Sequence, residues 1–311
     1  MPTWGEVLTE LHNSMAATGQ VDFDGIRRKY IRELAQLTGR DVIIYYSDWL
    51  QDGPSTSITL EDMQGLMEVC KDLHGTGLDL LLHTPGGSPE ATHRLVGYLQ
   101  SKFTNIRVFV PLAAMSAGTM WALSADEIVM GKHSQLGPID PQVWTGSRFA
   151  PARAIIGQFE KAKREIADKP ETLPAWFPML QQYGPSLLEE CENAEKLSVK
   201  LVSDWLAKGM LKTPAPGMPS AEEVATYFAN HGEHLSHALG IDRESARSRG
   251  LNITDLEDDP ALQDAVLSVH HATMHTFGGP AVKIVENHLG RAFVKMNQQM
   301  MMPQMMQFPR P

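Results

Sequence analysis

The segment LDLLLHTPGGSPEATHRL, residues 78–95, decides the fold of this chain. Its first part is an almost unbroken apolar run, which is typical of a strand buried on both faces of a parallel sheet. The part after Thr-Pro-Gly-Gly predicts a helix over 89–102. A strand that passes into a helix through Gly86 and Gly87 predicts backbone N–H groups held open at the edge of a sheet.

The same alternation of apolar strands and amphipathic helices extends from this segment in both directions. Strands are expected over 41–47, 106–111 and 126–131, with helices over 60–74 and 116–125. This order predicts an α/β fold with a mostly parallel sheet covered on both faces. Two helices are expected within 1–37, and further helices over 153–168, 185–211, 220–230, 242–249 and 257–297.

Composition excludes several classes of protein. The chain has 311 residues and a net charge of −10, so bulk charge gives no support to a nucleic-acid groove. Cys70 and Cys191 are the only cysteines, too few for a disulfide framework or a cysteine-based zinc site. The sequence shows neither a signal peptide nor the run of roughly 20 apolar residues that a membrane span needs. We therefore expect a soluble, cytoplasmic protein.

Two adjacent glycines after a strand have three uses: a tight turn, a phosphate cradle, or an oxyanion hole of N–H groups. A phosphate cradle has little support, because neither Gly-x-Gly-x-x-Gly nor Gly-Lys-Ser/Thr is present. A plain turn and an oxyanion hole both remain open from spacing alone.

A second stretch, VPLAAMSAGTMWALSA at 110–125, bears on that choice. It places Ser116 between a strand and a short helix, where free N–H groups and the helix dipole favour an anion. The N–H of Ala117 could then join that of Gly87 in holding a developing oxyanion. Taken alone, Ser116 is better explained as a plain helix N-cap.

The motifs HTPGG, AMSAGT and GKHSQLGPIDPQ resemble those of the Clp-fold serine peptidases, specifically the serine dehydrogenase proteinase (SDH) family. That family is related to signal-peptide peptidase and to the proteolytic subunit of the Clp protease. The N-terminal stretches PTWGEVLTEL and FDGIRRKYIRELAQLTGRDVIIYYSDWLQ match it as well, so the resemblance covers residues 2–255.

The sequence pattern predicts a helical extension at 1–37, helices at 256–298, and a Met/Gln-rich tail at 299–311 that is either disordered or a peptide-like arm for a partner. The resemblance implies a ClpP/crotonase-like superhelix of β-β-α units at 38–255. It also implies a homo-oligomeric peptidase without cofactor, with Ser116 as nucleophile and the Gly87 and Ala117 amides as the oxyanion hole. A peptide or unfolded protein substrate would add as a strand beside Gly86-Gly87. No ATPase motif is present, so the peptidase is expected to be ATP-independent unless another chain supplies an unfoldase.

The general base is less well defined. In the Clp protease a histidine follows the nucleophile by about two dozen positions, but this chain has Asp140 there and no histidine. The segment HLSHALGIDRESARSRGLNI, 234–253, resembles the region around the Clp triad aspartate and places His237 close to the position of that aspartate. We hypothesise an exchanged triad of Ser116, His237 as base and Asp140, which is admissible because triads are defined by geometry and role. Lys161 is the competing base, by resemblance to signal-peptide peptidase, while Arg153 hardly deprotonates.

The other histidines are expected to be structural or solvent-exposed and to take no part in catalysis. His83 and His133 are expected to be structural. His271 and His275 have the i, i+4 spacing of metal ligands, but no His-Glu-x-x-His motif is present and solvated helix faces are favoured, so no metal is predicted. Two other functions stay open: a binding or scaffold protein without a working base, and a crotonase-type enzyme that polarises an acyl-CoA thioester.

Overall fold

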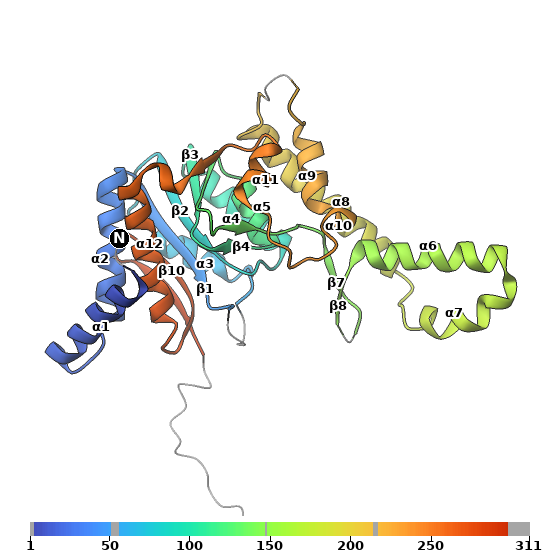
Figure 1. Ribbon diagram of the computed structural model, residues 1–311, viewed down its shortest axis with the longest axis horizontal. Helices are drawn as coiled ribbons and strands as arrows, with labels where there is room; N and C mark the ends of the chain where they lie inside the picture. The colour runs from blue at the N-terminus through green and yellow to red at the C-terminus, as the bar shows by residue number, and fades with distance from the viewer. Residues whose placement is uncertain (1–2, 51–55, 147, 214–216, 298–311) are drawn as a thin grey trace, which may run out of the picture.

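The computed structural model describes residues 3–50, 56–146, 148–213 and 217–297. A central sheet has the strand order β11-β10-β1-β2-β3-β5-β9 (Figure 1). Its strands are β1 (Asp41–Ser47), β2 (Gly77–His83), β3 (Asn105–Val110), β5 (Glu127–Met130), β9 (Ile253–Asp255), β10 (Ala281–Asn287) and β11 (Ala292–Met296).

Five neighbouring strands, β1, β2, β3, β5 and β9, run parallel, and β10 and β11 add an antiparallel edge beside β1. The apolar runs explain this arrangement, because both faces of the parallel strands are buried. Along β1, Ile43 and Tyr45 join the core on one face, whereas Val42 and Ile44 join the core on the other. The predicted mostly parallel α/β sheet is confirmed.

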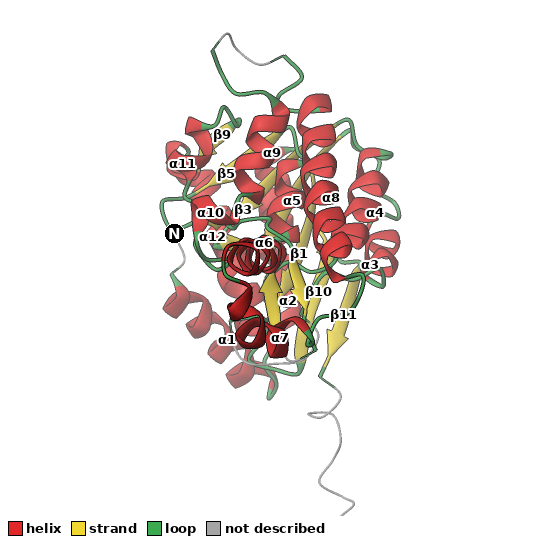
Figure 2. Cartoon of the chain, turned by 90° about the vertical axis from the view of Figure 1, so that its right-hand side faces the viewer, coloured by secondary structure: helices red, strands yellow, loops and turns green. Residues whose placement is uncertain are grey.

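Helices cover both faces of the sheet (Figure 2). On one face α12 packs on α2, and α1 contacts both helices. The other face is covered by α3, α4 and α5, with α8 and α9 outside α5. The bounds are α1 (Trp4–Thr18), α2 (Phe23–Thr38), α3 (Asp62–Val69), α4 (Pro89–Gln100), α5 (Ala117–Leu123), α8 (Leu187–Lys208), α9 (Ala221–Ala229), α10 (His231–His234), α11 (Arg243–Ser248) and α12 (Pro260–Thr276).

An arm formed by the hairpin of β7 (Gln142–Trp144) and β8 (Phe149–Pro151) and by α6 (Ala152–Asp168) and α7 (Leu173–Leu180) extends away from the sheet (Figure 1). A small core of its own, which includes Ile155 and Cys191, joins α6 to the start of α8. A second, two-stranded sheet pairs β4 (Ala113–Ala114), just before α5 in the sequence, with β6 (Gln135–Leu136), just before the arm.

The C-terminal region differs from its prediction. The expected helix over 257–297 ends at Thr276 in α12, and the chain continues as β10 and β11. Gly278, Gly279 and Pro280 stop the helix, and AVKIVEN is rich in β-branched residues that fit a strand. The helix expected over 60–74 is also shorter, and α7 was not expected. The predicted tail at 299–311 lies outside the described residues.

Within the ranges described, no helix is long and apolar enough to cross a membrane.

Candidate active site

Ser116 occupies a strained turn at the start of α5. Its φ of 52° and ψ of −120° lie in a region that residues with a side chain rarely adopt. Such a conformation costs of order 1–3 kcal/mol and persists only where surrounding contacts impose it. Thr119 ties the start of α5 to the segments on either side: its Oγ1 donates to the Ala114 carbonyl at 2.7 Å and accepts the Gly137 N–H at 2.8 Å. Ser116 is half-buried, so solvent reaches it.

The glycine turn after β2 lies directly against this serine. Gly86 has a φ of 97°, and a Cβ added there would lie 2.6 Å from the Met115 carbonyl oxygen and 2.8 Å from the Ser116 Cβ. Adding one carbon–carbon and one carbon–oxygen bond keeps the Ser116 Oγ within about 6 Å of the Gly86 Cα. Only glycine therefore fits at position 86, and the glycine turn lies directly beside the Ser116 side chain.

One edge of the turn is already occupied. The Ile58 N–H donates to the Gly86 carbonyl at 2.7 Å, and the Ser88 N–H donates to the Ile58 carbonyl at 3.0 Å. Because consecutive residues of an extended segment point their N–H groups to opposite edges, the Gly87 N–H points away from Ile58. Across the described ranges, neither the Gly87 nor the Ala117 N–H donates a hydrogen bond. Both are free to bind an oxyanion.

The carboxylate of Asp140 is buried and joins two histidines. Its Oδ1 lies 2.6 Å from His237 Nδ1, and its Oδ2 lies 3.0 Å from His231 Nδ1. Gln142 Nε2 also donates to Oδ2, at 2.9 Å. Contact is through Nδ1, and the Nε2 atom of each ring has no hydrogen-bond partner in the part of the chain that the structure describes, as in the histidine of a Ser-His-Asp triad.

The chain segments that carry Ser116, Asp140 and His237 are neighbours in the structure. Ala114, two residues before Ser116, pairs with Leu136 of β6. On its other side, Leu136 exchanges backbone hydrogen bonds of 2.9 and 2.8 Å with Ile241, four residues after His237. The serine, aspartate and histidine are therefore carried on three neighbouring segments. Ser116 Oγ makes no hydrogen bond to a histidine within the described residues, and such contacts often tighten only when substrate binds.

The competing base occupies a different setting. Lys161 is on α6 of the arm, its side chain is 63% exposed, and its Nζ lies 3.9 Å from Glu165. An exposed lysine that pairs with a carboxylate one turn away on its own helix is typical of a solvated helix face.

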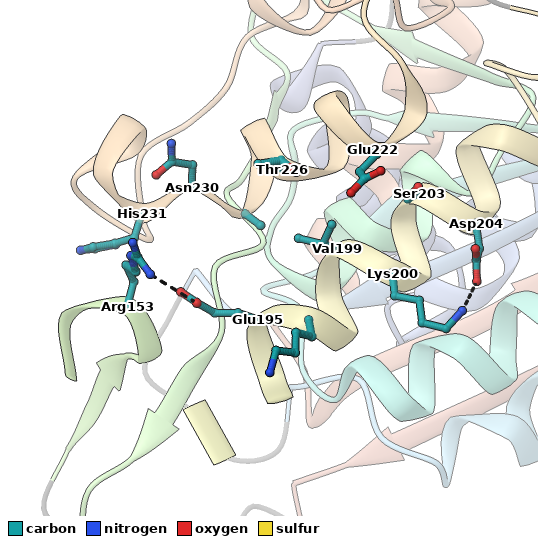
Figure 3. Close-up of a pocket in the computed structure, with 12 residues that line it drawn as sticks. Arg153, Glu195, Val199, Lys200, Ser203, Asp204, Glu222, Thr226, Asn230 and His231 are labelled. Atoms are coloured by element: carbon teal, nitrogen blue, oxygen red, sulfur yellow. Dashed lines mark hydrogen bonds and ion pairs between the residues drawn. The ribbon is translucent and has the colours of Figure 1, made fainter. Parts of the chain in front are cut away.

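A groove of about 680 Å³ opens beside His231, between the start of α6 and helices α8 and α9 (Figure 3). Arg153 at its edge lies 3.9 Å from Glu195, and Lys200 pairs with Asp204 at 2.8 Å. Burial raises the pKa of Glu195, and Arg153 opposes that rise. The groove presents charges of both signs and meets the Asp140 cluster through His231.

The remaining histidines occupy separate places. His83 is fully buried against Tyr46, Trp49 and His270, and burial lowers its pKa to about 4. His275 Nε2 contacts the Trp4 carbonyl at 3.0 Å. In the described part of the chain, no group of three or more His, Cys, Asp or Glu side chains could hold a metal ion.

Sequence reasoning overlooked His231 and Gln142 as neighbours of Asp140. The sequence shows three histidines at 231, 234 and 237 but does not show which of them face Asp140. In the structure His231 and His237 do, whereas His234 is buried with its Nε2 2.8 Å from the Tyr227 carbonyl. Gln142, two residues after Asp140, gave no signal of its own.

A strained serine set against a glycine turn, on a mostly parallel α/β sheet, defines the class of ClpP-like serine peptidases. Residues 55–174 match the model of the ClpP-like SDH-type serine proteinase family. The uncharacterized protein MJ0137 of Methanocaldococcus jannaschii is 36% identical over 201 residues, which are 62% of this chain and 68% of that protein. The chain belongs to the ClpP-like SDH-type serine proteinase family.

Other similarities are more distant. The uncharacterized protein MJ1495 of the same organism is 32% identical over 154 residues, 47% of this chain and 51% of its own length. Among solved structures, a mutant of the 1510-N membrane-bound stomatin-specific protease has a TM-score of 0.38 and 16% identity, covering 67% of this chain and 79% of that one. A second mutant of that protease, in complex with a substrate peptide, has a TM-score of 0.28 and 15% identity over 69% and 93% of the two chains. Both structural similarities are too weak to carry conclusions about this protein.

Proposed function

We propose that the protein hydrolyses peptide bonds through an acyl-enzyme on Ser116, without an ATPase of its own. The observation that carries this proposal is the close approach of Gly86 to Ser116, with the Gly87 and Ala117 N–H groups both without an acceptor among the described residues. Two fixed donors beside a nucleophile are the arrangement that stabilises the tetrahedral oxyanion of acyl transfer.

The proposed reaction uses His237 as the base. Its Nε2 takes the proton of Ser116 as Oγ attacks the peptide carbonyl, and Asp140 stabilises the imidazolium through Nδ1. The oxyanion binds to the N–H groups of Gly87 and Ala117. Collapse of the intermediate breaks the C–N bond, and His237 returns the proton to the leaving amine. Water, activated by the same imidazole, then releases the acyl group and restores Ser116.

His237 is preferred to Lys161 for two reasons. Asp140 orients the imidazole, and the segment that carries it is one strand away from the Ser116 segment. The exposed Lys161 has neither feature. The substrate is proposed to be a peptide or unfolded chain that pairs with the free edge of Gly86-Gly87, opposite Ile58.

Self-association is also proposed, through the arm. Trp144 and Phe149 on its hairpin are 55% and 65% exposed, with ring centroids 5.1 Å apart, and Phe177 on α7 is 51% exposed. Exposed apolar side chains gathered on one projection are typical of an interface. Cys70 and Cys191 are free and buried, which supports a reducing, cytoplasmic setting.

A fluorophosphonate probe tests the proposed function. The wild-type protein should gain one adduct by intact mass, located on Ser116 by peptide mapping, and Ser116→Ala should gain none. A folded wild-type protein that stays unlabelled would instead favour a binding or scaffold role.

A further inference from the structure

The oxyanion turn rests on a neighbouring segment, Ser57–Thr59, that belongs to no helix and no strand of the sheets. Ile58 in this segment makes both backbone hydrogen bonds to the turn and is 1% exposed. A Cβ added at Gly87 would lie 2.4 Å from both the backbone N and O of Ile58. Because the two backbones touch, a shift of Ile58 moves Gly87, and with it the N–H on the opposite edge.

Two buried charges hold this segment. Lys283 on β10 donates from Nζ to the Ser57 carbonyl at 2.8 Å and to the two carboxylate oxygens of Asp62 at 2.9 and 2.8 Å. Asp62 Oδ2 in turn accepts the Thr59 N–H at 2.8 Å. The backbone on each side of Ile58 is therefore tied to one member of the same ion pair.

The pair is isolated from solvent, since both side chains are fully buried. Burial lowers the pKa of Lys283, and Asp62 opposes that effect. Other groups around the pair are Tyr45, whose hydroxyl donates to Asp62 Oδ2 at 2.8 Å, and Lys295, whose Nζ lies 3.2 Å from Oδ1. A buried charge pair is costly to assemble and is by itself weak evidence for a contribution to stability. The contacts of this pair with the Ser57 carbonyl and the Thr59 N–H point to a positional task.

We infer that Lys283 and Asp62 are positioning residues that fix the Gly87 N–H of the oxyanion hole by clamping Ser57–Thr59. This inference rests on the proposed function of that hole. Loss of the Lys283 contact frees the Ser57 carbonyl, so Ile58 and the glycine turn gain room to move. A misplacement of about 1 Å in a catalytic group can cost about 100-fold in rate.

The test compares Lys283→Met with Lys295→Met in the full chain. Lys295 also contacts the Asp62 carboxylate, but it reaches no backbone atom of Ser57–Thr59. Lys283→Met should lower the maximal rate of fluorophosphonate labelling by about 10- to 100-fold while leaving the half-saturating probe concentration within about twofold. Lys295→Met should label at the wild-type rate, and Lys283→Arg should recover part of the loss. A folded Lys283→Met protein that labels like the wild type would overturn the inference.

Lys283→Met leaves a carboxylate buried without its cation, so the variant could fail to fold. Lys283→Met combined with Asp62→Asn removes both charges, keeps an acceptor for the Thr59 N–H, and should show the same loss of labelling rate. Amide hydrogen exchange gives a readout that needs no activity. Peptides covering 57–59 and 86–88 should exchange faster in the Lys283→Met variants than in the wild type, and at the wild-type rate in Lys295→Met. Unchanged exchange in all variants overturns the clamp, whereas an unlabelled wild type with the expected exchange pattern overturns only the proposed function.

Discussion

Asp140 Oδ1 lies 2.6 Å from His237 Nδ1, although 97 positions separate the two residues in the chain. From the sequence we hypothesised that both residues belong to a triad in which the positions of histidine and aspartate are exchanged relative to the Clp protease. The contact has the orientation that a general base requires, with Nε2 left free. The carboxylate also holds His231, so two imidazoles compete for the role of base.

Substitution of each histidine should separate these roles. His237→Gln should lower the rate of Ser116 labelling by about 100-fold or more, because the serine loses its proton acceptor. His231→Gln should lower it by less than about tenfold, since Asp140 keeps its contact with His237. Labelling rates measured over pH 5–9 would check both.

Lys161→Met serves as the matched control for this pair and should label at the wild-type rate, because the side chain is 63% exposed on the arm. If His231→Gln rather than His237→Gln removed labelling, His231 would be the base. A loss confined to Lys161→Met would restore the serine–lysine alternative.

The glycine turn should tolerate no side chain. In Gly87→Ala the new Cβ would lie 2.4 Å from the Ile58 backbone, so the turn must shift away from Ser116. We expect a loss of about 100- to 1000-fold in labelling rate, as for removal of an oxyanion donor, and a loss of about 1–3 kcal/mol in the free energy of unfolding.

Gly97→Ala is the control for that substitution. Gly97 lies inside α4 with open space around its Cα, so alanine should label normally and raise the free energy of unfolding by about 0.5–1 kcal/mol. Equal labelling by Gly87→Ala and the wild type would show that the turn takes no part in the reaction.

Features of the fold and the site could be predicted from the sequence where they depend on residues close together in the chain. The strand and glycine turn at 78–95 are set by neighbouring residues, so the local sequence pattern was sufficient to predict them. Strand β10 was mistaken for helix, because a short apolar run has no clear period and its place depends on pairing with β1, far away in the chain. The Lys283–Asp62 pair spans 221 positions and left no trace in the sequence.

The buried histidine at the end of β2 predicts acid sensitivity. Burial lowers the pKa of His83 to about 4 from 6.5, so folding favours the neutral imidazole. As the pH falls, the unfolded chain is protonated at this histidine before the folded chain is. The stability that depends on a neutral His83 is therefore complete above about pH 6.5 and is lost as the pH drops toward 4. By pH 5, His83 alone should cost about 2 kcal/mol in the free energy of unfolding.

Urea unfolding of the wild type and His83→Phe at pH 7 and pH 5 would measure this effect. Phenylalanine keeps a ring among Tyr46, Trp49 and His270 but cannot be protonated. The variant should therefore lose less stability than the wild type between the two pH values. An identical loss in both proteins would place the acid sensitivity elsewhere.

The arm predicts self-association that depends on its hairpin. Trp144→Ser with Phe149→Ser removes two side chains that are 55% and 65% exposed, so the fold should be kept while an apolar contact is lost. Light scattering at matched concentrations should show a smaller assembly for this variant than for the wild type. Leu289→Ser, at a 54% exposed position in the turn between β10 and β11, should leave the assembly unchanged. Equal masses for the hairpin variant and the wild type would exclude the hairpin as the interface, and a monomeric wild type would exclude self-association itself.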